Sequence, residues 1–373
     1  MGLARLLIAV SVLFASGASA PPERTEDASQ LVRQLGSPSF SAREKATHRL
    51  AALGMAAEAP LAVAARDPDA ELRRRAGKLL AQVREQDFLL RLESFAADAG
   101  GRRDYRIPFW RGYSKLLGDT RAARDLFVEM QRAEPELLEA LDTGGKTTGV
   151  MFSERCLMLV QAMESEVPAE VPLGTVASML LVSGSPQVSV DDQVTIQVYR
   201  FILQMSFQSS LRDEKIAPLL KKLLGAWIRR NNGSSFALQN LMLAFSLNLE
   251  EGLQVSLDIL RDAPQQQGFL QHALLGIGKY GDRKHLTLVE PHLKNIARCD
   301  AREVKGQQLQ AQIRDVALAV SVHLTGQPLA DYGFSVETLT DQALFHPGML
   351  GFATEAKRKA GFDKWATWKA AHP

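Results

Sequence analysis

Two stretches of this chain share a pattern at a spacing of 30 residues: FSAREKATHRLAAL at residues 40–53 and AELRRRAGKLLAQV at residues 70–83. The matched positions hold an arginine, a small residue and two apolar residues: Arg43 and Arg73, Ala46 and Ala76, Leu50 and Leu80, Leu53 and Val83. A fixed period of about 20 to 50 residues is typical of repeat proteins, in which each helical unit buries its apolar face on its neighbour. We therefore predict an all-α protein made of stacked antiparallel helix pairs.

Local signals mark where these helices start and stop. Ser41 and Glu44 have the spacing of a capping box, in which each side chain satisfies a backbone N–H at a helix start. Gly54 is placed to end the first helix in a left-handed conformation. Asp67-Pro68 predicts an N-cap followed by proline at the first position of the next helix. Residues 31–84 are thus expected to form successive helices joined by tight turns.

These two units resemble HEAT repeats of the armadillo-type α-solenoid class. The resemblance rests on the end of the first helix at Leu50-x-x-Leu53-Gly54, on Asp67-Pro68, and on Leu72-Arg73-x-x-Ala76-x-x-Leu79-Leu80. A third copy is formed by residues 273–282 and 313–318, in which Arg314 matches Arg73. The chain also resembles secreted bacterial HEAT-repeat proteins. The resemblance implies a curved helical stack and brings no activity with it.

The organisation along the chain follows from these segments. Residues 192–207 and 215–230 have apolar residues at helical spacing, and no alternating run predicts a sheet. The expected parts are a leader at 1–20, a disordered linker at 21–30, HEAT-like repeats at 31–88, degenerate helical repeats at 89–262, a further HEAT-like repeat at 263–330, and a connector with a capping helix at 331–373.

The N-terminus has the pattern of a secretory signal peptide. Arg5 precedes an apolar run over residues 6–14, and small residues follow up to Ala20. Cleavage is expected after Ala20 or after Ala18. No later apolar stretch reaches the length of about 20 residues that spans a bilayer. The sequence therefore predicts a periplasmic or extracellular protein without a membrane-spanning segment after the leader is removed.

Charge and composition argue for a folded chain and against a nucleic-acid partner. The chain is 46% hydrophobic and 23% charged, and 44 Lys and Arg face 42 Asp and Glu, which gives a net charge of +2. Three consecutive arginines, Arg73 to Arg75, fan around a helix and cannot form one phosphate-binding patch. We expect no nucleic-acid binding.

The two cysteines, Cys156 and Cys299, leave two possibilities open. In an exported protein they could form one disulfide. In a repeat stack, most contacts join sequence neighbours, which favours two separate buried thiols. Neither cysteine has a partner at the spacing of metal ligands, so no metal site is predicted.

One glycine motif tempts an enzymatic interpretation. Residues 276–281 fit G-x-G-x-x-G, the dinucleotide-binding fingerprint, but that chemistry needs a strand before the glycines. Residues 265–275 have a helical pattern instead. The sequence contains no G-x-S-x-G and no H-E-x-x-H motif. We therefore predict no cofactor and name no catalytic residue.

Four residues are candidates for contact with a partner. Arg73 and Arg314 would lie along the concave side of the stack if the second helices line it; alternatively they make contacts within their own repeats. Trp365 and Trp368 lie near each other on one helix after Gly361, and aromatic clusters dominate binding hot spots. Alternatively these rings cover the exposed end of the last repeat.

The predicted function is that of an exported, non-catalytic scaffold that binds another protein. The alternative is a cell-envelope enzyme of the hydrolase class whose catalytic residues cannot be identified from the sequence. A deep pocket with converging ionisable groups in residues 150–260 would favour the enzyme, whereas a shallow apolar or charged groove would favour binding.

Overall fold

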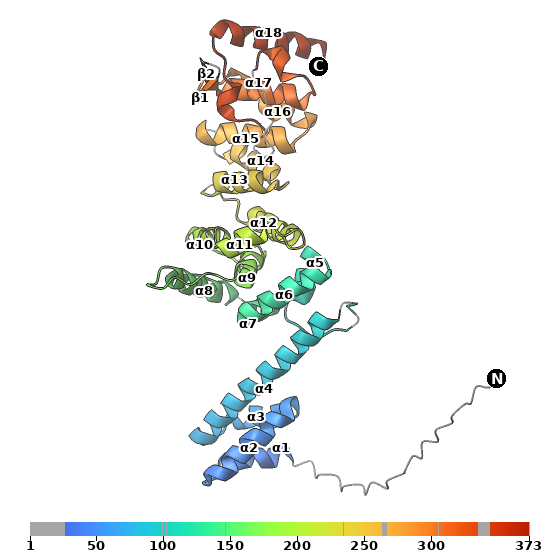
Figure 1. The fold of residues 1–373 in the computed structure, drawn as a ribbon, viewed down its shortest axis with the longest axis vertical. Helices are drawn as coiled ribbons and strands as arrows, with labels where there is room; N and C mark the ends of the chain where they lie inside the picture. Colours follow the sequence, from blue (N-terminus) through green and yellow to red (C-terminus); the bar gives the residue numbers. More distant parts are fainter. Residues whose placement is uncertain are drawn as a thin grey trace, which may run out of the picture. The chain divides into compact units, whose positions relative to one another are not determined.

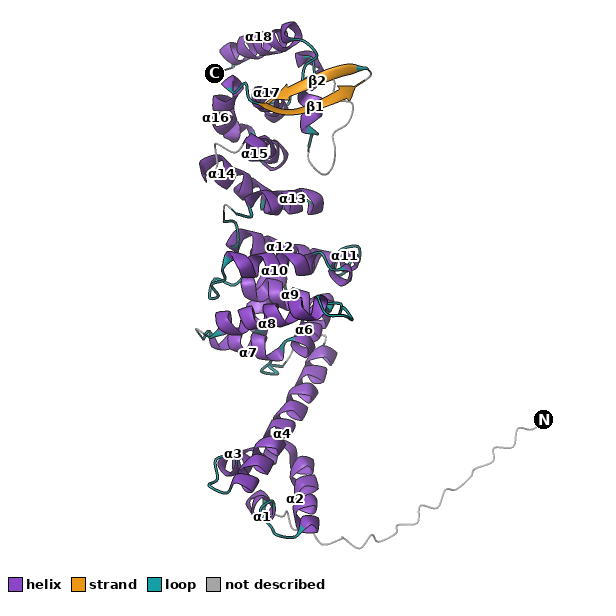
Figure 2. Cartoon of the chain, turned by 90° about the vertical axis from the view of Figure 1, so that its left-hand side faces the viewer, coloured by secondary structure: helices purple, strands orange, loops and turns teal. Residues whose placement is uncertain are grey.

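The computed structural model describes residues 27–372, apart from 99, 102, 146, 234, 263–266, 305 and 335–343. The chain divides into two compact units, residues 1–94 and 95–373. Helices dominate both units, and the strands of the described residues form a two-stranded sheet (Figures 1 and 2). The predicted all-α class is confirmed. The expected leader lies outside the described residues.

The first unit contains the same short-helix, long-helix pair twice. Its elements are α1 (Ala28–Gln34), α2 (Phe40–Leu53), η1 (Gly54–Ala57), α3 (Glu58–Ala64) and the first part of α4 (Ala70–Ala97). Both short helices, α1 and α3, have seven residues. Because α3 starts 30 residues after α1 and α4 starts 30 residues after α2, the period seen in the sequence is also the period of the structure.

Equivalent arginines hold the turns before the two long helices. Arg43 donates from Nη1 to the backbone oxygens six and five residues earlier, at 2.8 and 3.0 Å. Arg73 makes the same two bonds at 2.6 and 3.1 Å. The small residues Ala46 and Ala76 are fully buried, so that neighbouring helices approach closely around a core that includes Leu50. The matched positions are therefore structural.

The predicted starts of the long helices need correction. The N-cap of α2 is Ser39, so Ser41 and Glu44 lie inside the helix and form no capping box. The second long helix starts at Ala70 rather than at Pro68. Asp69 caps it, because its carboxylate accepts from the backbone N–H groups two and three residues later, at 2.8 and 3.0 Å. The end of α2 is as predicted: Gly54 follows it with φ 56°.

The second unit is a longer series of helices with one hairpin. Its elements are α5 (Trp110–Leu117), α6 (Arg121–Ala133), α7 (Pro135–Thr143), α8 (Thr148–Met163), α9 (Leu173–Ser183), α10 (Asp192–Ile202), α11 (Met205–Ser210), α12 (Ala217–Arg230), α13 (Ala237–Leu247), α14 (Gly252–Asp262), α15 (Gln267–Tyr280), η2 (Arg283–His285), α16 (Leu286–Val289), η3 (Glu290–Lys294), β1 (Arg298–Val304), β2 (Gln307–Gln312), α17 (Ile313–Leu324), η4 (Leu329–Tyr332), η5 (Pro347–Leu350) and α18 (Glu355–Ala371).

Helices of the second unit pack on partners close to them in sequence. α6 packs on α9, α9 on α12, α14 on α13 and α15, and α15 on α17. The starts of several helices have clear causes. Thr120 accepts from the Ala123 N–H to cap α6, Pro135 opens α7, and Asp191 accepts from the Val194 N–H to cap α10. This packing is compatible with a stack of helical repeats.

The hairpin was not predicted. β1 and β2 pair antiparallel, with Ala301 opposite Gln310 and an irregular register between Arg298 and Asp300, and Gly306 has φ 77° before β2 begins. Leu309 and Ala311 are buried while the residues between them are not, which is a period-two pattern. The long connection expected before residue 302 is thus filled by short helices and a strand.

Several expected boundaries also move. α1 starts at Ala28, before the expected end of the linker at residue 30, and α4 runs through the boundary placed at 88/89. The amphipathic segment 192–207 is broken into α10 and α11 at residues 203–204. The last helix, α18, begins at Glu355 and contains Gly361 in its interior. No helix of the described residues is both long and apolar enough to cross a membrane.

Candidate functional site

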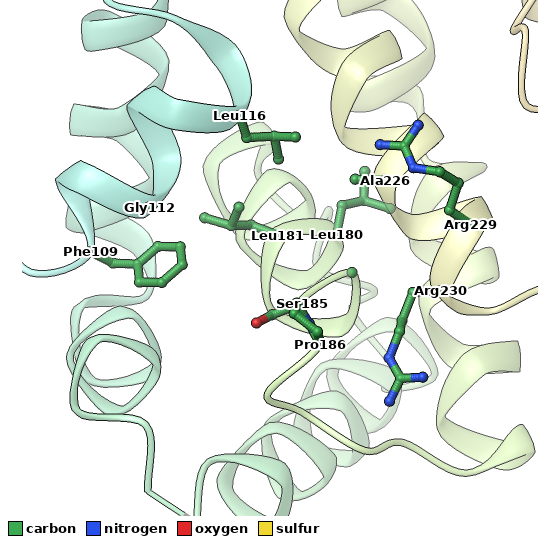
Figure 3. Close-up of a pocket in the computed structure, with 11 residues that line it drawn as sticks. Phe109, Gly112, Leu116, Leu180, Leu181, Ser185, Pro186, Ala226, Arg229 and Arg230 are labelled. Atoms are coloured by element: carbon green, nitrogen blue, oxygen red, sulfur yellow. The ribbon is translucent and has the colours of Figure 1, made fainter.

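An apolar groove lies between α5, α9 and α12 of the second unit (Figure 3). Its volume of about 400 Å³ is in the range of ligand-binding pockets. In Figure 3, α5 forms the left wall, α12 the right wall, and the end of α9 lies between them. The lining residues are mostly aliphatic or aromatic, with two arginines: Phe109, Gly112, Leu116, Leu180, Leu181, Gly184, Ser185, Pro186, Ala226, Arg229 and Arg230.

Phe109 is held in an unfavourable backbone conformation at the start of α5. Its φ of 59° and ψ of 9° are left-handed, a region that costs a residue with a side chain about 1–2 kcal/mol. The surrounding bonds fix it. The Gln131 side chain, which is 1% exposed, donates to the Pro108 carbonyl at 2.7 Å, and the Trp110 N–H donates to the Ile107 carbonyl at 3.3 Å. The neighbouring structure thus places the Phe109 ring in the groove wall.

Gly112 is required for this placement. A Cβ atom at Gly112 would lie 2.6 Å from Cζ of Phe109, which is closer than real Cβ contacts come. The ring therefore lies directly against the backbone of α5. Any larger residue at position 112 would push Phe109 out of the position that it has in Figure 3.

An aromatic cluster anchors the same end of α5. The Trp110 ring lies 4.7 Å from the Phe95 ring and 5.2 Å from the Phe127 ring. The Arg124 guanidinium, almost fully buried, lies over Phe95 and Trp110 and donates to the Asp119 carboxylate at 2.8 Å. Because this cation is paired and enclosed, it supports the groove wall and is not a ligand contact.

The two arginines of the right-hand wall differ in their partners. Arg229 forms an ion pair with Glu251, whose carboxylate lies against the backbone of Gly225. Arg230 is exposed, and within the described part of the chain it has no hydrogen-bond or ion-pair partner. Their side chains point in opposite directions in Figure 3. The groove therefore combines an apolar interior with a cation that is available at its edge.

The arginines predicted to contact a partner make contacts within the protein. Arg73 is bonded to the turn before α4. Arg314 donates to Gln312 at 2.6 Å and to Glu355 at 2.7 Å, and lies over the Phe362 ring. These arrangements correspond to the alternative of contacts inside the fold. The structure does not bring Arg73 and Arg314 together, since they belong to different units.

The predicted tryptophans lie on α18. Trp365 is 4% exposed and its ring stacks on Trp368 with centroids 5.2 Å apart. Tyr332 of η4 contacts Trp365 edge-on at 6.5 Å. Trp368 is half-buried and lies under the Arg283 guanidinium. Trp365 therefore helps to cover the helices beneath α18, as the capping alternative has it.

Both cysteines are free thiols, so the possible disulfide is not formed. Cys156 on α8 is buried and its sulfur lies 3.8 Å from that of Met179 on α9, whereas Cys299 belongs to β1 of the hairpin. Burial raises the pKa of each thiol to about 12. Since the thiolate is the reactive form, neither cysteine is set up as a nucleophile.

The glycine motif is helical, as predicted. Gly276 and Gly278 lie within α15, not between a strand and a helix. A Cβ atom at Gly276 would collide with the Ser256 hydroxyl of α14, and one at Gly278 would lie 2.7 Å from Leu344. These glycines allow neighbouring segments to approach α15 closely. The structural context of a dinucleotide site is not met here.

The groove offers little for acid–base or nucleophilic chemistry. Its lining contains no carboxylate, imidazole or thiol. Among the described residues, no group of three His, Cys, Asp or Glu side chains could hold a metal ion. The lining can exclude water from apolar side chains and pair a carboxylate with Arg230. Comparison with known proteins finds no matching family model, no matching curated protein and no matching solved structure.

The sequence analysis missed the groove residues. Phe109, Leu181 and Arg230 come from three helices that are far apart in the sequence, and no spacing rule joins them. The one local signal is Phe109-Trp110 three residues before a glycine, an aromatic pair that a helix start would not usually require. This signal indicates a wall residue but says nothing of what lies opposite.

Proposed function

We propose that this chain is an exported, non-catalytic scaffold built from HEAT-like repeats, which binds another protein through the groove between α5, α9 and α12. The observation that carries the proposal is the groove's lining, which is apolar with a free arginine at its edge. Partner-binding sites on helical repeat proteins are surfaces of this kind, formed between successive helices.

Two further observations support the proposal. The 30-residue period of the first unit supports a repeat protein, and the matched turns bonded by Arg43 and Arg73 support a HEAT-like one. The leader predicted from Arg5 and the apolar run after it supports export. A pocket that performs hydrolysis would need converging ionisable groups, and this groove supplies arginines alone.

The test is affinity capture of the mature protein from the envelope of the cells that make it. The variant Ala226→Trp fills the groove from the α12 wall, and Ala366→Trp makes the same change at an exposed position of α18. Both variants are first checked for an unchanged helical spectrum and melting temperature. We expect the wild type and Ala366→Trp to retain one stoichiometric protein that Ala226→Trp loses.

The same preparations are assayed with model ester, peptide and glycan substrates. Turnover that is lost in Ala226→Trp, with no protein retained by the wild type, would support the hydrolase alternative and overturn the scaffold. Retention of the partner by all three proteins would also contradict the assignment of the groove.

A further inference from the structure

The groove has rigid apolar walls, which selects side chains by shape. Phe109 is fixed by its backbone bonds and by contact with Gly112, and Leu180 and Leu181 belong to the buried helix α9. At the opposite wall, α9 and α12 meet closely, because a Cβ atom at Gly184 would lie 3.3 Å from the Trp227 nitrogen. A ligand therefore has to bring apolar side chains that enter between preformed helices.

The charge at the edge of the groove selects an anionic group. Arg229 is already neutralised by Glu251, whereas Arg230 is exposed without a partner among the described residues. A carboxylate that docks beside the apolar interior would pair with Arg230 in a partly desolvated setting, where charge-assisted hydrogen bonds are strongest. The second arginine adds positive potential that disfavours a basic ligand.

The backbone around the groove argues against a terminal carboxylate as that anion. Capture of a chain end uses backbone N–H groups that are free to donate. In the turn after α9, the N–H groups of Gly184, Ser185 and Gln187 donate to Leu180, Val182 and the Ser185 hydroxyl, and Pro186 has no N–H. An acidic side chain within a partner's sequence is the anion that this site can accept.

The walls also indicate the form of the partner segment. All three walls are helices, and the described strands belong to the hairpin at residues 298–312, so no strand edge lines the groove. An apolar trough between helices is the surface on which an amphipathic helix lays its apolar face. Such a helix presents an acidic side chain beside that face at a spacing of three or four residues.

We infer that the groove binds an acidic amphipathic helix of another protein, with its apolar side chains against Phe109, Leu116 and Leu181 and a Glu or Asp side chain paired with Arg230. This inference rests on the proposed function and adds the chemistry of the partner.

The experiment measures binding of fluorescently labelled helical peptides to the full mature chain by anisotropy. One peptide carries leucines at helical spacing flanked by glutamates; its matched versions replace the glutamates by glutamines or by lysines. We expect the glutamate peptide to bind, and the glutamine and lysine peptides to bind about tenfold or more weakly, which corresponds to the loss of one good ionic contact. Binding should weaken as salt is raised.

Three variants locate the charge. Arg230→Glu should weaken the glutamate peptide about tenfold and strengthen the lysine peptide, whereas Arg230→Lys should retain most of the affinity. Lys78→Glu, an equal change of net charge at an exposed site of the first unit, should leave the affinity unchanged. Ala226→Trp should abolish binding of every peptide.

The outcomes separate this inference from the proposed function. Equal affinity for the glutamate and glutamine peptides, or an Arg230→Glu variant that binds like wild type, would overturn the acidic partner while the groove remained a binding site. Failure of every peptide, alongside a captured envelope protein that depends on Ala226, would do the same. Failure of both experiments would overturn the scaffold itself.

Discussion

Arg43 and Arg73 show how one residue type can be tied to a period. Each side chain closes the turn before a long helix by donating to two backbone oxygens five and six residues earlier. A neutral side chain cannot replace these bonds, and the oxygens would have to be hydrated instead. The arginines therefore recur at the spacing of 30 because the turn recurs.

This role predicts equal costs at the two positions. Arg43→Ala and Arg73→Ala should each lower the free energy of unfolding of the first unit by about 1 kcal/mol, the net value of charge-assisted bonds at a partly exposed site. Arg74→Ala, on the same helix and 64% exposed, should change it by less than about 0.5 kcal/mol. Urea denaturation followed by circular dichroism gives the values. Loss of partner binding at unchanged stability in Arg73→Ala would instead return it to the interaction surface.

Three partly buried histidines predict acid sensitivity. Burial lowers the pKa of His272, His292 and His323, because desolvation disfavours the charged ring. In the unfolded chain their pKa is about 6.5, so below that pH the unfolded state binds more protons than the folded state. The free energy of unfolding should therefore fall as the pH drops below about 6.5, until the lowered pKa is passed.

His323→Gln tests this titration. The slope between pH 7 and 5.5 should be shallower than in wild type, by up to about 1.4 kcal/mol per pH unit for one histidine. The exposed His48→Gln serves as the control. An unchanged slope in His323→Gln, measured by urea unfolding at each pH, would show that this ring titrates alike in both states.

At the scale of elements, close packing explains glycines that propensity does not. Gly276 lies in the middle of α15, where alanine would favour the helix by about 1 kcal/mol. However, the added methyl group would collide with Ser256 of α14 and lie 3.3 Å from Leu241 of α13. Gly77 lies in the interior of α4, and a Cβ atom there would meet nothing within 4 Å.

The two glycines should therefore respond with opposite signs. Gly276→Ala should destabilise the second unit by about 1–3 kcal/mol, the usual cost of overpacking, and adding Ser256→Ala should restore part of the loss. Gly77→Ala should stabilise the first unit by up to about 1 kcal/mol. Thermal unfolding measures both. A stabilising Gly276→Ala would mean that α14 and α15 are further apart than the structure has them.

The elements also show what the sequence could and could not predict. The repeated helices of the first unit were predictable because their period, the glycine after α2 and the small buried residues all agree. The hairpin was missed because its strands are rich in arginine and glutamine, although Leu309, Ala311 and Ile313 alternate with polar residues. Helix starts were displaced by two residues where two caps competed, as at Asp67 and Asp69.

The candidate site was predictable only in kind. An apolar or charged groove was expected for a binding protein, but its residues come from segments between positions 109 and 230 that packing alone brings together. The strained backbone of Phe109 depends on the buried Gln131 and on Gly112, and neither has a signature in the sequence. Arg73, Arg314 and Trp365 were singled out because of their type, and their surroundings give them structural roles.

At the scale of the whole molecule, the chain has two compact units, and each has an apolar core. Leu50 is fully buried in the core of the first unit. Leu50→Ala should lower the stability of that unit by about 3 kcal/mol, the usual cost of a cavity. We expect the change in one step of a denaturation curve only, seen by hydrogen exchange of peptides from α2 and α4. A uniform shift of all peptides would show that the chain unfolds as one cooperative unit.

The most direct test of the central claim is site-specific photo-crosslinking of the mature protein in its own envelope. A photoreactive residue is placed at Leu116 in the groove wall, or at Val150, which is 59% exposed on α8 outside the groove. Our account predicts that Leu116 captures one protein through a segment with leucines and acidic residues at helical spacing, and that Val150 does not. Capture of that protein from Val150 alone, or equally from both positions, would contradict it.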